Sequence, residues 1–88
     1  MARSEDIRLL FGQAVRRIRV GQNMSQEQLA YEAELDRSYV GGVERGDRNP
    51  SLVAIQKIAQ GLKTSLADLF AECDGRGARE PNVRAARR

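Results

Sequence analysis

Apolar residues recur every three or four positions along most of the chain, and this spacing predicts an all-α protein. The longest such run places Ile7, Leu10, Phe11, Ala14, Val15 and Ile18 on one side of a single helix. Ser4 can cap the start of this helix, and Gly21 can end it in a left-handed conformation. The first helix is therefore expected to bury one face and to expose the other.

Two short helices are predicted between positions 25 and 45. Ser25 can cap the first of them, with Gln28 completing a capping box, and Asp36 can cap the second. Their apolar faces consist of Leu29, Ala30, Ala33, Val40 and Val43. Only Glu34 and Leu35 separate the two helices, and so short a connection makes them cross at a steep angle.

Two further helices are predicted to close the core. The fourth is expected from Leu52 to Leu62, and its core side consists of Leu52, Ile55, Ile58, Ala59 and Leu62. A fifth, short helix follows a cap at Thr64 or Ser65. It carries Leu66, Leu69 and Phe70. Three large apolar residues on so short a helix are hard to bury in one small domain, so some of them can form a contact between subunits.

The charge of the chain is divided unevenly along it. The 88 residues carry a formal charge of +3, but positions 1–73 hold ten basic and ten acidic residues. Positions 74–88 hold five arginines and two acids and so account for the whole excess. We therefore predict a folded domain over 1–73 and a disordered basic tail over 74–88, because the tail has few apolar residues and no periodicity.

The composition argues against several classes of function. The chain has no histidine and one cysteine, Cys73, which argues against a metal site and against a disulfide framework. No nucleophile and base pair can be assembled, so an enzyme is not expected. No signal peptide or membrane-spanning run is seen, and a cytoplasmic protein without a cofactor or small-molecule ligand is expected.

The central segment resembles a known family. The SQEQLA start, Ala30, Val40 and the run ERGDRNPSL are similar to the helix-turn-helix of the Cro and phage-repressor (XRE) family. The resemblance covers about residues 11–70. It implies a five-helix, lambda-repressor-like domain that binds double-stranded DNA as a homodimer. The run LDRSYVGGVERGDRNPS is also similar to the controller proteins of restriction-modification systems, one branch of that family.

The resemblance assigns candidate roles to particular residues. The side chains expected to read bases from the second helix of the motif are Arg37, Ser38 and Tyr39. Those expected to contact phosphates are Ser25, Gln26, Arg45, Arg48, Asn49 and Ser51. An ion pair between Arg17 and Glu44 is expected to hold the first helix to the recognition helix. The expected dimer interface consists of Leu62, Leu66, Leu69 and Phe70.

The sequence departs from the family pattern at two places. Glu34 stands where the turn often has a glycine, so a left-handed backbone there would be strained. Gly41 and Gly42 lie inside the recognition helix and offer no side chains for base contacts. They can bring the helix close to the sugar-phosphate backbone, or they can simply reduce the number of contacts, and the sequence leaves both open.

The function favoured by these residues is sequence-specific regulation of transcription by a homodimer on a palindromic operator. An autoregulatory controller of a restriction-modification system is the more specific form. The alternatives are an antitoxin-type DNA-binding protein and a protein-interaction module of the same fold. The glycine pair and the neutral folded part favour the interaction module, whereas Arg37, Gln26 and Arg48 argue against it.

Overall fold

The computed structural model describes residues 6–75, and within that range every regular element is a helix. The helices are α1 (Ile7–Gly21), α2 (Gln26–Ala33), α3 (Arg37–Arg45), α4 (Leu52–Gly61) and α5 (Leu66–Cys73). The all-α prediction and the number and order of the helices are confirmed. The predicted tail lies outside the described residues from position 76 onward, so the boundary between domain and tail stays a prediction.

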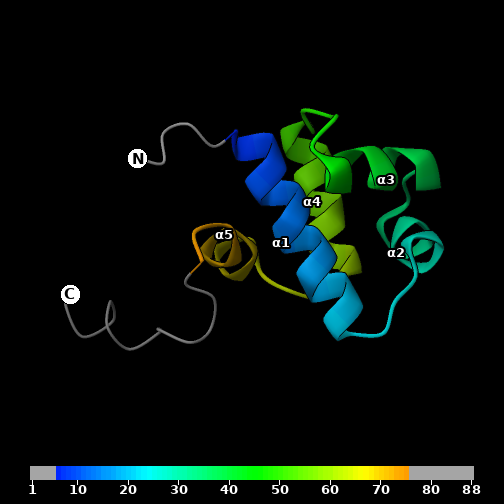
Figure 1. Cartoon of the computed structure of the whole chain (residues 1–88). Helices are drawn as coiled ribbons and strands as arrows, with labels where there is room; N and C mark the ends of the chain where they lie inside the picture. The colour runs from blue at the N-terminus through cyan, green and yellow to red at the C-terminus, as the bar shows by residue number, and fades with distance from the viewer. Residues whose placement is uncertain (1–5, 76–88) are drawn as a thin grey trace.

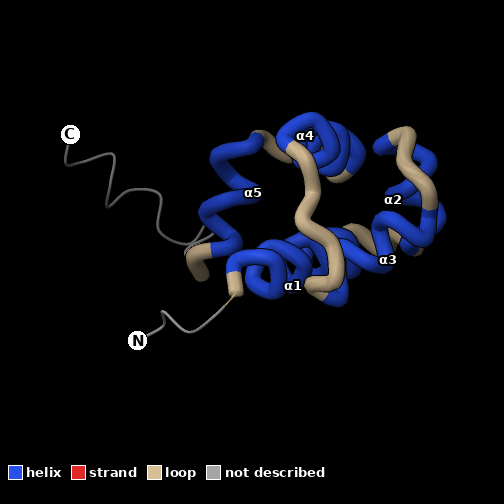
Figure 2. Tube along the Cα trace, turned by 90° about the horizontal axis from the view of Figure 1, so that it is seen from above, coloured by secondary structure: helices blue, strands red, loops and turns tan. Residues whose placement is uncertain are grey.

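The helices enclose a single core. α1 and α4 lie across the middle of the molecule, with α5 on one side and α2 and α3 on the other (Figures 1 and 2). α1 packs against both α3 and α5, and α2 packs against both α3 and α4. The largest side chains that are fully buried between them are Leu29, Ile58, Leu62, Leu69, Val15, Val40 and Val43. The core thus fixes the α2–α3 pair on one side of the domain.

The ends of α1 differ from the sequence-based prediction. Ser4 lies outside the described residues, and the N-cap residue is Asp6, whose carboxylate accepts the backbone N–H of Arg8 at 3.0 Å. Hydrogen bonds from Arg8 lower the pKa of Asp6 to about 2. Gly21 is the last helical residue and is not left-handed, whereas Asn23 is, with φ 59°. Asparagine tolerates this conformation better than most residues, so the turn to α2 needs no glycine.

The caps of α4 and α5 are both serines. The Ser51 hydroxyl accepts the backbone N–H of Ala54 at 3.0 Å, and the Ser65 hydroxyl accepts that of Asp68 at 2.9 Å. Ser65, not Thr64, therefore starts α5. Leu52 was expected in the core, but it is 76% exposed at the first position of α4.

α1 and α3 approach each other very closely at Gly12. A Cβ at this position would lie 2.2 Å from the carbonyl oxygen of Val43 and 2.8 Å from that of Glu44. Gly12, Val15 and Arg19 follow one another at steps of three and four, so they form one face of α1. This face contacts α3 and determines how deeply the recognition helix is seated.

Candidate nucleic-acid interface

The α2–α3 pair has the geometry of a helix-turn-helix. The Ser25 hydroxyl accepts the backbone N–H of Gln28, and the Gln28 side chain accepts that of Ser25, both at 3.0 Å. The predicted capping box is confirmed. Glu34 ends α2 with φ 60° and ψ 44°, the left-handed conformation that the sequence suggested would be strained there. Its cost is about 1 kcal/mol, which the packing of the two helices offsets.

α3 is strongly amphipathic. Val40, Val43 and Glu44 are buried on its inner side, whereas Arg37 and Ser38 are exposed at its start. Asp36 occupies the N-cap position as predicted, but its side chain makes no capping hydrogen bond. The first turn of α3 thus presents two polar side chains outward, which is the arrangement that base reading requires.

Tyr39 is less available than the sequence suggested. Its ring is half-buried and packs against the core. The guanidinium carbon of Arg48 lies 5.0 Å from the ring centroid, within the range of a cation–π contact. Tyr39, which was predicted to read bases, and Arg48, which was predicted to contact phosphates, are therefore in contact with each other.

The predicted ion pair between Arg17 and Glu44 is wrong. Glu44 pairs with Arg19, whose Nε lies 2.6 Å from Glu44 Oε2 and whose Nη2 lies 3.0 Å from Oε1. Arg17 instead pairs with Glu72 of α5 at 3.0 Å. Two residues along a helix correspond to a rotation of about 200°, so Arg17 and Arg19 point to different neighbours. Arg19 shares a face with Gly12 and Val15, and this periodicity could have identified the correct residue.

The Arg19–Glu44 pair is buried and fully hydrogen-bonded. Arg19 is 8% exposed and Glu44 is 7% exposed. Arg19 also donates from Nη1 to the carbonyl oxygen of Met24 at 2.7 Å. Hydrogen bonds to the Glu44 carboxylate raise the pKa of Arg19, so the guanidinium keeps its charge although it is buried. It connects α1, the turn before α2, and α3.

Gln26 extends this network toward the surface. Its Nε2 donates to Glu44 Oε1 at 3.0 Å. The same Glu44 oxygen thus accepts from Arg19 and from Gln26, which places the predicted phosphate ligand of α2 directly on the recognition helix. No feature of the sequence indicated this contact, because it joins residues 18 positions apart on different helices.

The two glycines of α3 make room for long side chains. A Cβ on Gly41 would lie 3.3 Å from Arg45 Nη1 and 3.6 Å from Gln26 Oε1. A Cβ on Gly42 would lie 2.7 Å from Arg48 Cγ. Gly41 and Gly42 are accordingly buried although they lie on the outward half of the recognition helix. Predicted DNA contacts from α2, α3 and the following loop thus converge over this pair.

The loop after α3 carries the remaining predicted phosphate contacts. Gly46 ends α3 in the left-handed conformation, with φ 82°. Arg45 pairs with Asp47 at 2.9 Å on the surface, and Asn49 is exposed. Ser51 accepts a backbone N–H at the start of α4, which leaves its own hydroxyl hydrogen to donate outward.

The predicted dimer residues fall into two groups. Leu62 and Leu69 are fully buried in the core, so their assignment to an interface is wrong. Leu66 and Phe70 are each 40% exposed and remain candidates. The sequence-based assignment missed two apolar residues at the start of α4, Leu52 and Val53, which are 76% and 60% exposed. The sequence-based prediction placed Leu52 on the core side of α4 and gave Val53 no role.

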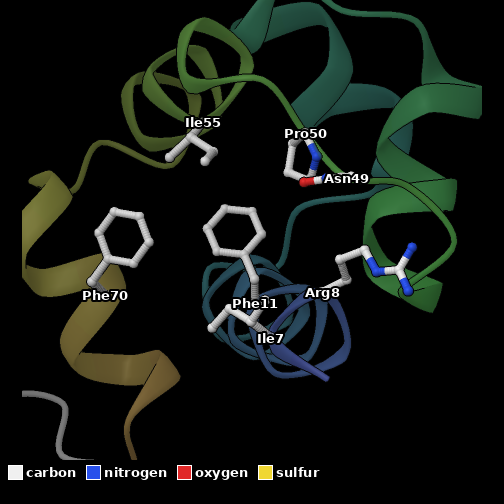
Figure 3. Close-up of a pocket in the computed structure, with 7 residues that line it drawn as sticks. All are labelled: Ile7, Arg8, Phe11, Asn49, Pro50, Ile55 and Phe70. Atoms are coloured by element: carbon white, nitrogen blue, oxygen red, sulfur yellow. The ribbon is translucent and has the colours of Figure 1, made fainter. Parts of the chain in front are cut away.

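A small hollow between α1, α4 and α5 does not resemble a ligand site. Its lining consists of Ile7, Arg8, Phe11, Asn49, Pro50, Ile55 and Phe70. Figure 3 shows the rings of Phe11 and Phe70 beside each other, while the guanidinium of Arg8 points away. The volume is about 80 Å³, against roughly 300 Å³ or more for small-molecule pockets. The DNA-facing surface is therefore the better candidate for the functional site.

No group of three or more His, Cys, Asp or Glu side chains is arranged to hold a metal ion within residues 6–75. None of the described helices is long and apolar enough to span a membrane.

Comparison with known sequences points to one group of proteins. A family model described as helix-turn-helix matches residues 15–69. The control protein C.BamHI of Bacillus amyloliquefaciens is 52% identical over 68 residues, which cover 76% of this chain and 84% of that protein. The control protein C.MunI of a Mycoplasma species is 39% identical over 70 residues, which cover 78% of this chain and 95% of that protein.

Solved structures agree with these matches. The restriction-modification controller protein C.AhdI of Aeromonas hydrophila has a TM-score of 0.70 and 52% identity, covering 72% of this chain and 96% of that one. The controller protein C.Esp1396I, crystallised as a tetramer with its natural 35-base-pair operator, has a TM-score of 0.77 and 30% identity. That match covers 82% of this chain and 95% of the C.Esp1396I chain.

Proposed function

The chain belongs to the helix-turn-helix family and, within it, to the controller proteins of restriction-modification systems, and from this premise we propose its function. It is a sequence-specific DNA-binding regulator of transcription that acts as a homodimer on a two-fold symmetric operator. The genes it controls are those of a restriction-modification system, its own included. Such a regulator acts where the chromosome lies, so we assign it to the cytoplasm.

The exposed start of α3 is the observation that carries this proposal. Arg37 and Ser38 point away from the core at the first turn of a helix whose inner side is anchored by Val40 and Val43. An arginine there can donate two hydrogen bonds to the O6 and N7 atoms of guanine. A helix held this rigidly can enter a major groove without losing its packing.

The phosphate contacts we propose surround this helix. Ser25 and Gln26 stand at the N-terminus of α2, where unpaired backbone N–H groups and the helix dipole favour an anion. Arg45, Asn49 and Ser51 lie at the other end of α3. Gln26 Nε2 has a second hydrogen besides the one donated to Glu44, and that hydrogen is the one available to a phosphate.

Regulation, and not catalysis, is the activity we assign. C.BamHI and C.MunI, to which the chain is similar, are control proteins, and neither name describes an enzyme activity. The single thiol, Cys73, is buried, and its burial raises its pKa, so it stays protonated and is a poor nucleophile. Nothing observed in the structure favours an antitoxin or a pure interaction module.

Binding to DNA tests the proposal directly. The wild-type protein is expected to select a family of related duplexes from a randomised DNA pool. Arg37→Ala is expected to lose about 1–3 kcal/mol of discrimination at one base-pair position in each half-site. Arg17→Ala is the matched control, because it removes the same charge from the α5 side of the domain.

Two results would contradict this assignment. If Arg37→Ala weakened binding to every DNA sequence equally, Arg37 would be a phosphate contact only. Absence of any selected duplex for the wild-type protein would argue against sequence-specific binding altogether.

The dimer contact we propose uses the exposed apolar residues of α4 and α5. Leu52, Val53, Gln56 and Leu66 line a shallow hollow of about 280 Å³, and Phe70 follows Leu66 one turn along α5. Apolar residues that gather on a small surface mark an interaction site. The structure of C.Esp1396I as a tetramer on its operator supports a second copy of the chain as the partner.

A charge placed in this surface is expected to break the dimer. Leu66→Glu should shift the protein toward the monomer and weaken the dimerisation constant by at least about tenfold, since burying an unpaired carboxylate costs several kcal/mol. Sedimentation velocity at micromolar concentration measures the change. Val20→Glu alters an apolar residue of similar exposure at the end of α1 and should leave the assembly state unchanged. A dimeric Leu66→Glu protein would place the interface elsewhere.

A further inference from the structure

Gly42 occupies a place on α3 where a side chain would face DNA. It follows Ser38 by four positions and Tyr39 by three, so these residues share one side of the helix. Yet Gly42 is buried within the described domain. The Arg48 side chain causes this burial, because a Cβ on Gly42 would lie 2.7 Å from Arg48 Cγ and 3.2 Å from Arg48 Nε.

The backbone after α3 brings Arg48 back to this point. Gly46 turns the chain with φ 82°, and the N–H of Asp47 then donates to the carbonyl oxygen of Gly42 at 2.9 Å. The next residue is Arg48. Its side chain therefore starts beside Gly42, runs across the glycine and ends with its guanidinium carbon 5.0 Å from the centroid of the Tyr39 ring.

The charges nearby leave this guanidinium available. Asp47 is the closest acid in the sequence, but it pairs with Arg45 at 2.9 Å. Arg48 appears in none of the ion pairs found between residues 6 and 75. Stacking on an aromatic ring fixes the plane of a guanidinium while its N–H edges stay free to donate. An arginine held in one orientation also loses less conformational entropy on binding.

We propose that Arg48 reads base edges from the surface of the recognition helix, held there by Tyr39 and by the space that Gly42 leaves. Arg48 thus supplies, from the loop, the side chain that α3 lacks at position 42. Gly42 is a positioning residue that determines specificity without touching DNA. The ligand is a base pair that presents two acceptors in the major groove, such as a guanine. This inference rests on the proposed DNA-binding function and assigns it a further specificity determinant.

The adjacent glycines provide a matched test. In Gly42→Ala the new methyl group meets the flexible chain of Arg48, so Arg48 moves off the helix while the backbone stays in place. In Gly41→Ala the methyl group meets only the ends of Arg45 and Gln26, at 3.3 Å or more. Both changes improve helix propensity equally, so neither should lower the melting temperature.

Selection from a randomised duplex pool, followed by titration of single base-pair variants, measures the effect. Gly42→Ala and Arg48→Ala are each expected to lose about tenfold discrimination at the same base-pair position of each half-site. Gly41→Ala is expected to keep it. The double variant Gly42→Ala/Arg48→Ala should be no worse than either single one, because both remove the same contact.

Arg48→Lys separates base reading from phosphate attraction. Lysine keeps the charge but lacks the planar donor edge, so discrimination should fall while the salt dependence of binding stays near the wild-type slope. Full discrimination in Gly42→Ala or in Arg48→Lys would overturn the proposal, as would additive losses in the double variant. These outcomes differ from failure of the proposed function, in which the wild-type protein itself would select no duplex.

Discussion

Gly12→Ala is expected to lower the free energy of unfolding by about 3 kcal/mol or more, the upper range for overpacking a core. The added methyl group would lie 2.2 Å from the carbonyl oxygen of Val43 and 2.8 Å from that of Glu44. Both are backbone atoms and cannot rotate away as a side chain can. α1 and α3 would have to separate, and a domain of this size has only about 5–15 kcal/mol of stability to lose.

Urea unfolding followed by circular dichroism measures this loss. Gly21→Ala is the matched control, because Gly21 is the last residue of the same helix and, apart from the adjoining backbone of α1, no heavy atom lies within 4 Å of the position of its Cβ. Alanine there should leave stability unchanged or raise it by up to about 1 kcal/mol. A Gly12→Ala protein as stable as the wild type would contradict the close approach of α1 and α3.

Most of the helices could be predicted because their signals are local. The capping box of Ser25 and Gln28, the N-cap position of Asp36 and the N-cap at Ser65 each depend on residues within a few positions of one another. Local sequence therefore determines where these helices begin. The end of α1 was mispredicted for the same reason: Gly21 and Asn23 are both compatible with the turn, and only the path to α2 distinguishes them.

The contacts between helices were harder to predict. Periodicity shows which residues share a face, but it does not show which neighbour the face meets. Leu62 follows α4 directly and Leu69 lies in α5. Both helices also carry exposed apolar residues, and only the packing of the helices shows that Leu62 and Leu69 are the buried ones. The prediction of an Arg17–Glu44 ion pair failed for the same reason, since α1 directs Arg17 toward α5 and Arg19 toward α3.

The role of the glycine pair in α3 also depended on tertiary structure. The sequence suggested either a close approach to DNA or a loss of contacts. The structure gives a different explanation, in which side chains from α2, from the end of α3 and from the following loop fill the space over Gly41 and Gly42. Such an arrangement involves residues that are distant along the chain, so the composition of the helix alone does not reveal it.

Glu44→Gln is expected to be comparably destabilising, by about 3–5 kcal/mol, because it leaves the guanidinium of Arg19 buried without its charged partner. Every polar side-chain atom buried in the described domain has a hydrogen-bond partner, and this substitution disrupts the pairing of the Arg19 guanidinium. Urea unfolding again provides the measurement. Glu72→Gln is the control: it removes the acid of the more exposed Arg17 pair and should cost at most about 1 kcal/mol.

A double substitution separates the effect of an unpaired buried charge from the effect of altered packing. Arg19→Met combined with Glu44→Met removes both charges, and it should recover much of the stability lost in Glu44→Gln, because a buried ion pair contributes little beyond its own desolvation cost. The recovered protein should still bind DNA less tightly, since Gln26 loses the Glu44 oxygen that orients its amide. Stability and DNA affinity would then separate. Equal recovery of both would show that Gln26 needs no support from the ion pair.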